Sequence, residues 1–134
     1  MKEDIYFSEE HKMLRDMVRE FAQKIVKPLA QELDEKGAFP HESVKQMAKL
    51  GLMGIPWEEK YGGTGMDMVA LVIAIEEIGK VCCSTSATLM AHTSLGTAPI
   101  AMFGTEEQKE KYLPGLASGK KIGAFGLTEP NAGS

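Results

Sequence analysis

The sequence predicts an all-α protein, an irregular bundle of five or six helices that ends in one extended segment. Two features of its 134 residues carry this prediction. Apolar residues recur at intervals of three and four through most of the chain, which is the pattern of helices with one buried face. Only the stretch from Gly123 to Ser134 departs from it, because small, β-tolerant and turn-forming residues alternate there in an order that no helix favours. We therefore expect a helical domain over residues 1–121 and the start of a different segment over residues 122–134.

The first helix is predicted to begin after Ser8, whose hydroxyl can cap the free N–H groups of the first turn. Glu9 and Glu10 then lie at the positive end of the helix dipole. Pro28 falls inside the apolar pattern and predicts a kink, after which the helix continues to Gly37. The helix is expected to pack on one face only, along the stripe formed by Leu14, Met17, Val18, Phe21, Ala22, Ile25 and Leu29.

A short second helix and a glycine-rich loop follow. The helix is expected to start with Pro40 at its first position and to stop at Gly51. In the loop, residues 62–65 (Gly-Gly-Thr-Gly) require turn geometry, and the nearby Trp57 would cover the edge of the core. The same glycines would also suit a phosphate, but no strand clearly precedes them and no Lys-Ser or Lys-Thr pair follows, which favours a structural turn.

The middle of the chain predicts two further helices. Asp67 is expected to cap the first of them, in which residues 68–75 are apolar on every side. Such a helix must be covered all round, by the other helices or by something outside this chain. The next helix is expected to start at residues 84–86, and Gly96 and Pro99 are expected to divide it into two pieces.

The last helix is predicted to begin with a capping box, with Thr105 at the N-cap and Gln108 at the third helical position. Pro114 is expected to interrupt this helix before Gly119. The residues expected to point inward are Tyr112, Leu113 and Leu116.

Composition excludes several classes of partner. The formal net charge is −4 with both signs mixed, so a phosphate backbone is not a favoured ligand and we expect no nucleic acid partner. No basic and apolar leader opens the chain, and its longest weakly charged run, residues 82–103, is too polar and too rich in helix breakers to span a membrane. We expect a soluble protein of the cytoplasm, in which Cys82 and Cys83 are free thiols. The three histidines are isolated and predict no metal site.

The terminal segment has the residue types of a loop that holds a ligand through its backbone. Gly123 and Gly126 leave room for a flat or bulky group to approach the main chain. Thr128 supplies a hydroxyl that donates and accepts, the Glu-Pro pair after it is held extended, and a turn leads to Ser134. From residue types alone, an ordinary connection between two domains explains the same pattern.

The string Phe-Gly-Leu-Thr-Glu-Pro-Asn-Ala-Gly-Ser at residues 125–134 resembles the flavin-binding signature of the acyl-CoA dehydrogenase family. The resemblance covers the whole chain and is to the N-terminal helical domain of the short-chain, butyryl-CoA type. It implies FAD as cofactor, desaturation of an acyl-CoA between its α and β carbons, an electron-transfer flavoprotein as electron acceptor, and a homotetramer. Further strings of that family occur in the same order at residues 7–11, 21–28, 50–55, 61–65, 76–77 and 103–114.

The resemblance also implies which residues hold the cofactor. Phe125, Gly126, Leu127 and Thr128 would lie along the flavin ring. Backbone amides and the Thr128 hydroxyl would hydrogen-bond its pyrimidine edge and draw electron density toward it. Ser134 would reach the FAD pyrophosphate or the acyl-CoA beside it.

Five apolar residues would meet the substrate and the electron acceptor, on the same resemblance. Leu89, Met90 and Leu95 would line the acyl pocket. Phe21 and Met66 fall where some relatives offer an apolar anchor to the electron acceptor.

No catalytic residue is assigned within this chain, because the family places the carboxylate that removes the α-proton in its last domain. We therefore expect a fragment without dehydrogenase activity of its own, in which residues 122–134 lead toward a β-barrel that the chain does not contain. Two alternatives remain from the sequence. One is a stand-alone helical interaction domain without a cofactor, and the other is a related flavin oxidase or monooxygenase.

Overall fold

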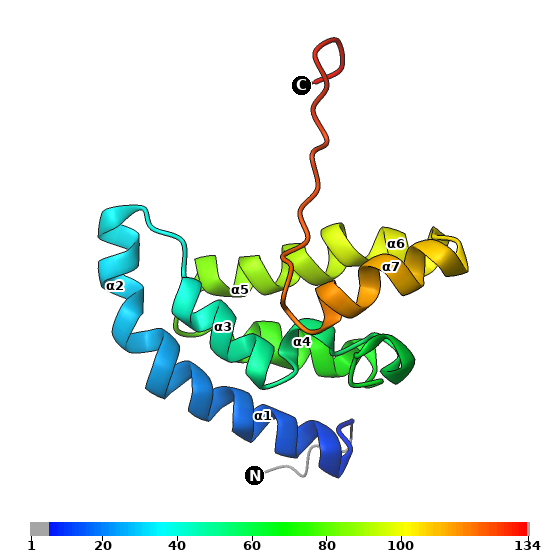
Figure 1. Ribbon diagram of the computed structural model, residues 1–134. Helices are drawn as coiled ribbons and strands as arrows, with labels where there is room; N and C mark the ends of the chain where they lie inside the picture. The colour runs from blue at the N-terminus through cyan, green and yellow to red at the C-terminus, as the bar shows by residue number, and fades with distance from the viewer. Residues whose placement is uncertain (1–5, 134) are drawn as a thin grey trace.

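The computed structural model describes residues 6–133 and confirms the all-α fold. Within this range, seven α-helices join into five continuous helical runs, because π-helical segments connect α1 to α2 and α5 to α6 (Figure 1). The α-helices are α1 (Glu9–Phe21), α2 (Lys27–Lys36), α3 (His41–Lys49), α4 (Met68–Gly79), α5 (Cys83–Met90), α6 (Ala98–Phe103) and α7 (Glu106–Ala117). The π-helical segments are η1 (Ala22–Val26) and η4 (Ala91–Thr97), and two short 3-10 turns are η2 (Leu52–Gly54) and η3 (Glu59–Tyr61).

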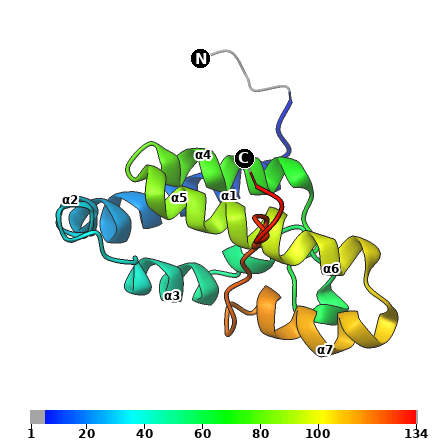
Figure 2. The same cartoon turned by 90° about the horizontal axis from the view of Figure 1, so that it is seen from above.

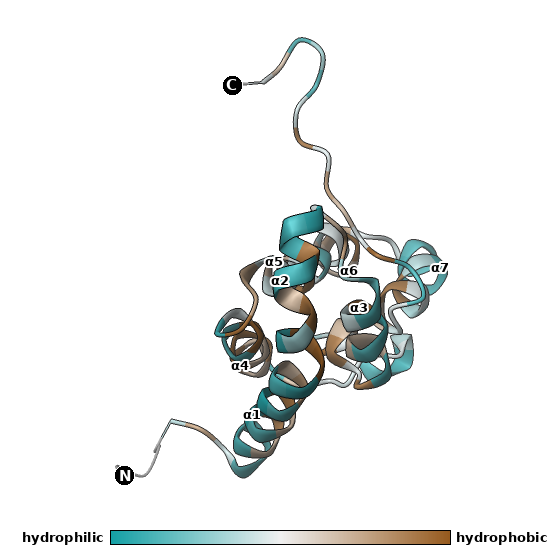
Figure 3. Ribbon diagram, turned by 90° about the vertical axis from the view of Figure 1, so that its left-hand side faces the viewer, coloured by the Kyte–Doolittle hydropathy of each residue, from teal (hydrophilic) through white to brown (hydrophobic). Residues whose placement is uncertain are grey.

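The helices pack around one core. The central helix α4 lies against both α1 and α5, α3 contacts α5, and α6 lies beside α7 (Figures 1 and 2). The outward surface of α1 is mainly hydrophilic, as the amphipathic pattern predicted (Figure 3). Removal of apolar side chains from water is the main favourable term in such a fold. Those that are fully buried include Met47, Leu52, Met53, Ile55, Ile78 and Leu89.

Local signals set the ends of the first helical run. The Ser8 hydroxyl accepts a hydrogen bond from the His11 N–H at 3.2 Å, and the His11 ring accepts one from the Ser8 N–H at 3.3 Å, which confirms the predicted cap. The irregularity predicted at Pro28 takes the form of η1, just before it, and the run changes direction there (Figure 1). A proline has no N–H to donate to the preceding turn, so the winding changes at that point. Gly37, with a φ of 57°, ends α2 as predicted.

The prolines interrupt fewer helices than predicted. Pro40 is the N-cap of α3, one position before the predicted one, because its ψ of 60° is outside the helical range. Gly96 lies within η4 and Pro99 lies in the first turn of α6, so the predicted division of this run is wrong. The helix continues instead through a π-helical segment, which accommodates the proline. Pro114 lies inside α7, which continues to Ala117 without the predicted interruption.

The capping box of α7 is confirmed. The Gln108 N–H donates to the Thr105 hydroxyl at 3.2 Å, and the Thr105 N–H donates to the Gln108 side-chain oxygen at 2.9 Å. Leu113 and Leu116 are buried as predicted, which holds α7 against the bundle. Tyr112 is 38% exposed, so its predicted inward position is wrong. One residue turns a helix by about 100°, and this places Tyr112 beside the buried stripe rather than within it.

The apolar helix α4 is covered on only part of its surface. Asp67 caps it as predicted, since its carboxylate accepts a hydrogen bond from the Ala70 N–H at 2.9 Å. The inward face packs against α1 and α5, but Met68, Val69 and Val72 are between 43% and 58% exposed. The described part of the chain therefore does not supply the all-round cover that the sequence predicted for this helix.

None of the helices within residues 6–133 combines the length and the apolar character that a membrane crossing requires.

A buried carboxylate ties α1 to α4. Glu77 is 3% exposed, and the Nε and Nη2 atoms of Arg19 each donate to it at 3.0 Å while Lys80 Nζ donates at 2.7 Å. Burial by itself raises the pKa of Glu77, but the hydrogen bonds from Arg19 and Lys80 outweigh it and leave the pKa below its ordinary value. The carboxylate is therefore ionised at neutral pH and accepts three hydrogen bonds from two cationic side chains.

Replacing Arg19 by alanine is expected to lower the free energy of unfolding at neutral pH by about 1–3 kcal/mol. Glu77 then stays buried without its bidentate partner, and the exposed half of the Arg19 side chain keeps the loss below that of a fully buried pair. Because the pKa of Glu77 is lowered in the fold, its contribution is complete above the unfolded value of about 4.3 and is lost as the pH falls through the lower folded value.

Urea unfolding of the parent chain and of the Arg19→Ala variant at several pH values measures the difference in their free energies of unfolding. The control variant is Lys36→Ala, which removes an exposed ion pair with Glu32 and is expected to change stability by less than about 0.5 kcal/mol. Equal losses in the two variants, or a loss that does not shrink at acid pH, would contradict the prediction.

Candidate functional site

The predicted extended segment leaves the bundle after α7. Residues 122–128 form no helix, and the segment rises away from the helical layer to end in a turn (Figures 1 and 3). In that turn the Glu129 N–H donates to the Ala132 carbonyl at 2.8 Å, and the Ala132 N–H donates to the Glu129 carbonyl at 3.1 Å. The segment and its turn agree with the prediction. Ser134, with its predicted contact to FAD or acyl-CoA, lies outside the described residues.

The segment exposes both its backbone and its apolar side chains. Phe125 and Leu127 are 56% and 77% exposed, and a Cβ atom added to Gly126 would meet nothing within 4 Å. Within the part of the chain that the structure describes, the N–H groups of residues 124–128 have no hydrogen-bond acceptor. The Thr128 side chain is also exposed. A row of free donors beside exposed apolar side chains can receive a flat ligand that carries acceptors along one edge.

The start of the extended segment at Gly123, called its root below, packs tightly against η4. A Cβ atom added to Gly96 would lie 2.4 Å from the carbonyl carbon of Gly123, and one added to Gly123 would lie 3.0 Å from the Cα of Gly96. Two glycines therefore allow two backbones to touch. The room that the sequence predicted at Gly123 is filled by this helix, whereas the room at Gly126 remains open to a ligand.

A buried histidine holds the same root. His92, on η4, is fully buried, and its Nδ1 accepts a hydrogen bond from the Gly123 N–H at 2.9 Å. Burial lowers the pKa of His92, and the backbone carbonyls of Met53 and Leu116 oppose this only in part. No pattern in the sequence points to this role, because the partner of His92 is a backbone amide 31 residues further along the chain.

The residues predicted to line the acyl pocket lie on one helical run but in different surroundings. Leu89, on α5, is fully buried and belongs to the hydrophobic core. Met90 and Leu95 are 45% and 49% exposed. They lie on the helical run formed by α5, η4 and α6, and η4 contacts the root of the segment. Met90 and Leu95 are thus accessible from outside the bundle, whereas Leu89 faces other helices.

The two residues predicted to anchor the electron acceptor also differ. Phe21 is buried in the core, whereas Met66 is partly buried and lines a surface groove of about 610 Å³ between α1 and the glycine-rich loop. Met13, which is 72% exposed, and Met17 line the same groove from α1. Thioether side chains adapt readily to different apolar partners.

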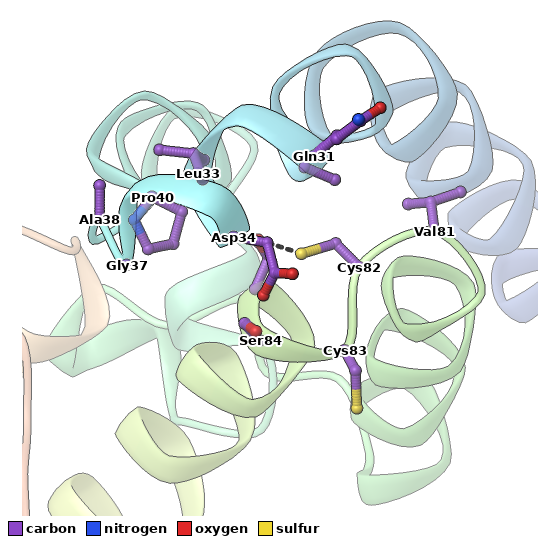
Figure 4. A pocket seen from close by; sticks show the side chains of 12 residues that line it. Gln31, Leu33, Asp34, Gly37, Ala38, Pro40, Val81, Cys82, Cys83 and Ser84 are labelled. Carbon is purple, nitrogen blue, oxygen red and sulfur yellow. Dashed lines mark hydrogen bonds between the residues drawn. The ribbon is translucent and has the colours of Figure 1, made fainter.

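A further cavity of about 460 Å³ lies between α2 and the start of α5 (Figure 4). It is lined in part by Gln31 and Asp34 from α2 and by Cys82 and Cys83. Both cysteines are free, and the Cys82 sulfur accepts a hydrogen bond from the Thr85 hydroxyl at 3.2 Å. None of the predicted site residues lines this cavity. Over residues 6–133, no three histidine, cysteine or acidic side chains come together in a way that would hold a metal ion.

The fold and the segment define a class of protein, a helical domain that presents an extended, unbonded backbone beside apolar side chains at its carboxyl end. The family model for the acyl-CoA dehydrogenase N-terminal domain matches residues 8–120. The chain therefore belongs to the acyl-CoA dehydrogenase family, as the sequence resemblance predicted.

Individual relatives agree with this assignment. The chain is 54% identical over 131 residues to the short-chain specific acyl-CoA dehydrogenase of Clostridium acetobutylicum, and the match covers 98% of this chain and 35% of that protein. It is similar, with a TM-score of 0.91 and 45% identity, to a chain in the structure of the electron transferring flavoprotein of Acidaminococcus fermentans, over 97% of this chain and 34% of that one. An acyl-CoA dehydrogenase complexed with FAD from Bacillus anthracis gives a TM-score of 0.88 and 37% identity, over 97% of this chain and 23% of that one. The chain thus spans about a third of the length of the Clostridium relative.

Proposed function

We propose that this chain is the N-terminal part of an FAD-dependent acyl-CoA dehydrogenase, which desaturates a short-chain acyl-CoA between its α and β carbons. The supporting observation is the row of free N–H groups at residues 124–128, beside the exposed Phe125 and Leu127. An isoalloxazine is the complement of this surface, with a flat ring and acceptor atoms along its pyrimidine edge. The likeness to the FAD complex from Bacillus anthracis supports the same cofactor.

The groups that would hold FAD lie on consecutive residues. The N–H groups of Gly126, Leu127 and Thr128 and the Thr128 hydroxyl would donate to the pyrimidine edge, and Phe125 would lie along the ring. FAD, when bound, accepts the hydride that leaves the substrate. Donors aimed at the edge where negative charge develops favour that transfer, because they need not reorganise during the reaction. Ser134 remains the proposed contact to the pyrophosphate or to the acyl-CoA.

Removal of the α-proton is proposed to require a base outside this chain. Glu77 is buried and held by Arg19 and Lys80, so it is not free to meet a substrate beside the segment, and Glu129 is assigned to the terminal turn rather than to the role of a base. The chain by itself is therefore proposed to have no dehydrogenase activity. Met90 and Leu95 would face the acyl chain from the helical run next to the segment root.

An electron-transfer flavoprotein is the proposed electron acceptor, and the methionine-lined groove between α1 and the glycine-rich loop is the proposed contact. The likeness to the Acidaminococcus fermentans structure supports this pairing. The complete protein is proposed to be a homo-oligomer. A stand-alone interaction domain is the second candidate, and the exposed apolar side chains of α4 favour it.

A chimeric enzyme separates the two candidates. This chain would replace the corresponding stretch of the Clostridium acetobutylicum enzyme, to which it is 54% identical. The proposed function predicts a yellow protein that contains FAD and oxidises butyryl-CoA with an artificial electron acceptor. A chimera with a native-like circular dichroism spectrum but without flavin would contradict the proposal and favour the interaction domain.

Replacing Thr128 by valine in this chimera is expected to weaken FAD binding about fivefold to tenfold, because one hydrogen bond is lost while the shape of the side chain is kept. Titration of the apo-chimera with FAD, followed by flavin fluorescence, measures the dissociation constant. The matched control is Thr88→Val on α5, whose hydroxyl donates to the Ser84 carbonyl within its own helix. Equal affinity in the Thr128 variant and the unaltered chimera would remove Thr128 from the site.

A further inference from the structure

We propose that His92 is a positioning residue, whose neutral imidazole clasps the Gly123 N–H and thereby sets the direction in which the extended segment leaves the bundle. The Nδ1 atom can accept this hydrogen bond only when it carries no proton, so the ring proton of the neutral form lies on Nε2. The hydrogen bond between His92 and Gly123, called the clasp below, is present in the chain itself. Its effect on FAD binding rests on the proposed function.

Because of its position along the chain, this hydrogen bond controls the orientation of the segment that follows it. Before it, the Lys121 N–H donates to the Gly115 carbonyl at 2.9 Å, close to the end of α7. After it, the N–H groups of residues 124–128 have no acceptor within the described range, and the next backbone bonds belong to the turn at Glu129. The Gly123 amide is therefore the last fixed point before the donors that are proposed to meet FAD. A change in its orientation moves all of them together.

The π-helical segment η4 places the imidazole at this point. The Thr97 hydroxyl donates to the His92 carbonyl at 2.8 Å, and the Thr93 hydroxyl donates to the Leu89 carbonyl, so both ends of η4 are tied by buried side chains. The contact between Gly96 and Gly123 then brings the segment within reach of Nδ1. The backbone contact with Gly96 and the hydrogen bond with His92 therefore fix the same residue, both from η4.

The surroundings of His92 keep it neutral. The backbone carbonyls of Met53, in η2, and Leu116, in α7, raise its pKa less than burial lowers it, and the buried Nε2 has no hydrogen-bond partner among the described residues. No charged side chain among the described residues contributes to the shift. Protonation would place a donor opposite the Gly123 N–H, and two donors cannot bond to each other. The clasp should therefore be complete above the unfolded histidine pKa of about 6.5 and be lost as the pH falls through the lower folded value.

Two variants of the chain test the clasp. His92→Asn keeps an acceptor near the position of Nδ1 but cannot titrate, and His92→Leu keeps bulk without any acceptor. Nitrogen-15 chemical shifts of the ring are expected to show an unprotonated Nδ1 in the parent chain near neutral pH. The protection factor of the Gly123 amide in hydrogen exchange is expected to fall about fivefold or more in the leucine variant and to recover in the asparagine variant. In the asparagine variant it should not depend on pH, whereas in the parent chain it should fall on acidification.

The amide of Ile78, in the core of α4, serves as the internal control for global stability. Equal protection of Gly123 in the parent and leucine chains, or a proton on Nδ1 near neutral pH, would overturn the clasp. In the chimera, the leucine variant is expected to bind FAD more weakly and the asparagine variant to restore binding. Unchanged FAD affinity in the leucine chimera would overturn the positioning role. A chimera without flavin would instead count against the proposed function, while the exchange measurements on the chain would still decide the clasp.

Discussion

Replacing Gly63 by alanine is expected to lower the free energy of unfolding by about 3 kcal/mol or more. A Cβ atom at this position would lie 2.0 Å from the Trp57 carbonyl oxygen and 2.8 Å from the Gly54 carbonyl oxygen. Both are backbone atoms and cannot rotate away as the end of a side chain would. They also belong to the turn, because the Thr64 N–H donates to the Gly54 carbonyl at 3.0 Å and the Gly65 N–H donates to the Trp57 carbonyl at 2.9 Å.

Urea unfolding followed by the fluorescence of Trp57 measures this loss. The matched control is Gly62→Ala, at the neighbouring glycine with a φ of 84° and open space around its Cα. Only backbone strain opposes that change, at about 1 kcal/mol. A Gly63 variant no less stable than the Gly62 variant would show that the loop relaxes without loss. The contacts of Gly63 also favour the structural turn considered for residues 62–65 over a phosphate site, since the chain itself fills the space beside Gly63.

Replacing Leu89 by alanine is expected to lower the free energy of unfolding by about 2–5 kcal/mol, because the side chain is fully buried among the helices and its removal leaves a cavity. Met90→Ala, at the next residue, is the matched control. Its side chain is 45% exposed, and the expected loss is about 1 kcal/mol or less.

The same two variants in the chimera test the predicted acyl pocket. A contact to the acyl chain predicts a higher KM for butyryl-CoA in the Met90 variant, with a loss of stability of no more than about 1 kcal/mol. Lower stability at unchanged KM in the Leu89 variant would assign Leu89 to the core alone. Equal stability of the two variants would contradict the packing described for α5.

Interactions between near neighbours in the sequence were predicted well. The caps at Ser8, Asp67 and Thr105 and the helix end at Gly37 depend on residues within one turn of each other, and the structure confirms them. The extended character of residues 122–128 follows in the same way from glycine and proline at short range. Such features depend on local stereochemistry, which a single sequence contains.

Features that depend on distant neighbours were not predicted. The hydrogen bond between His92 and Gly123 joins residues 31 positions apart, and neither residue type predicts it. The π-helical segments before Pro28 and Pro99 were expected as a kink and a break, because the sequence shows where winding must change but not how the surrounding helices resolve it. The exposure of Tyr112 likewise depends on how α7 is rotated against the bundle.

The free backbone of the extended segment should make the chain sensitive to proteolysis in a cell. Proteases cut most readily at exposed stretches that are not tied into secondary structure, and the exposed Lys120 and Lys121 stand at the start of this one. Any partner that covers the segment would hide these sites. Degradation would then remove the uncovered chains first and leave those whose donors are engaged.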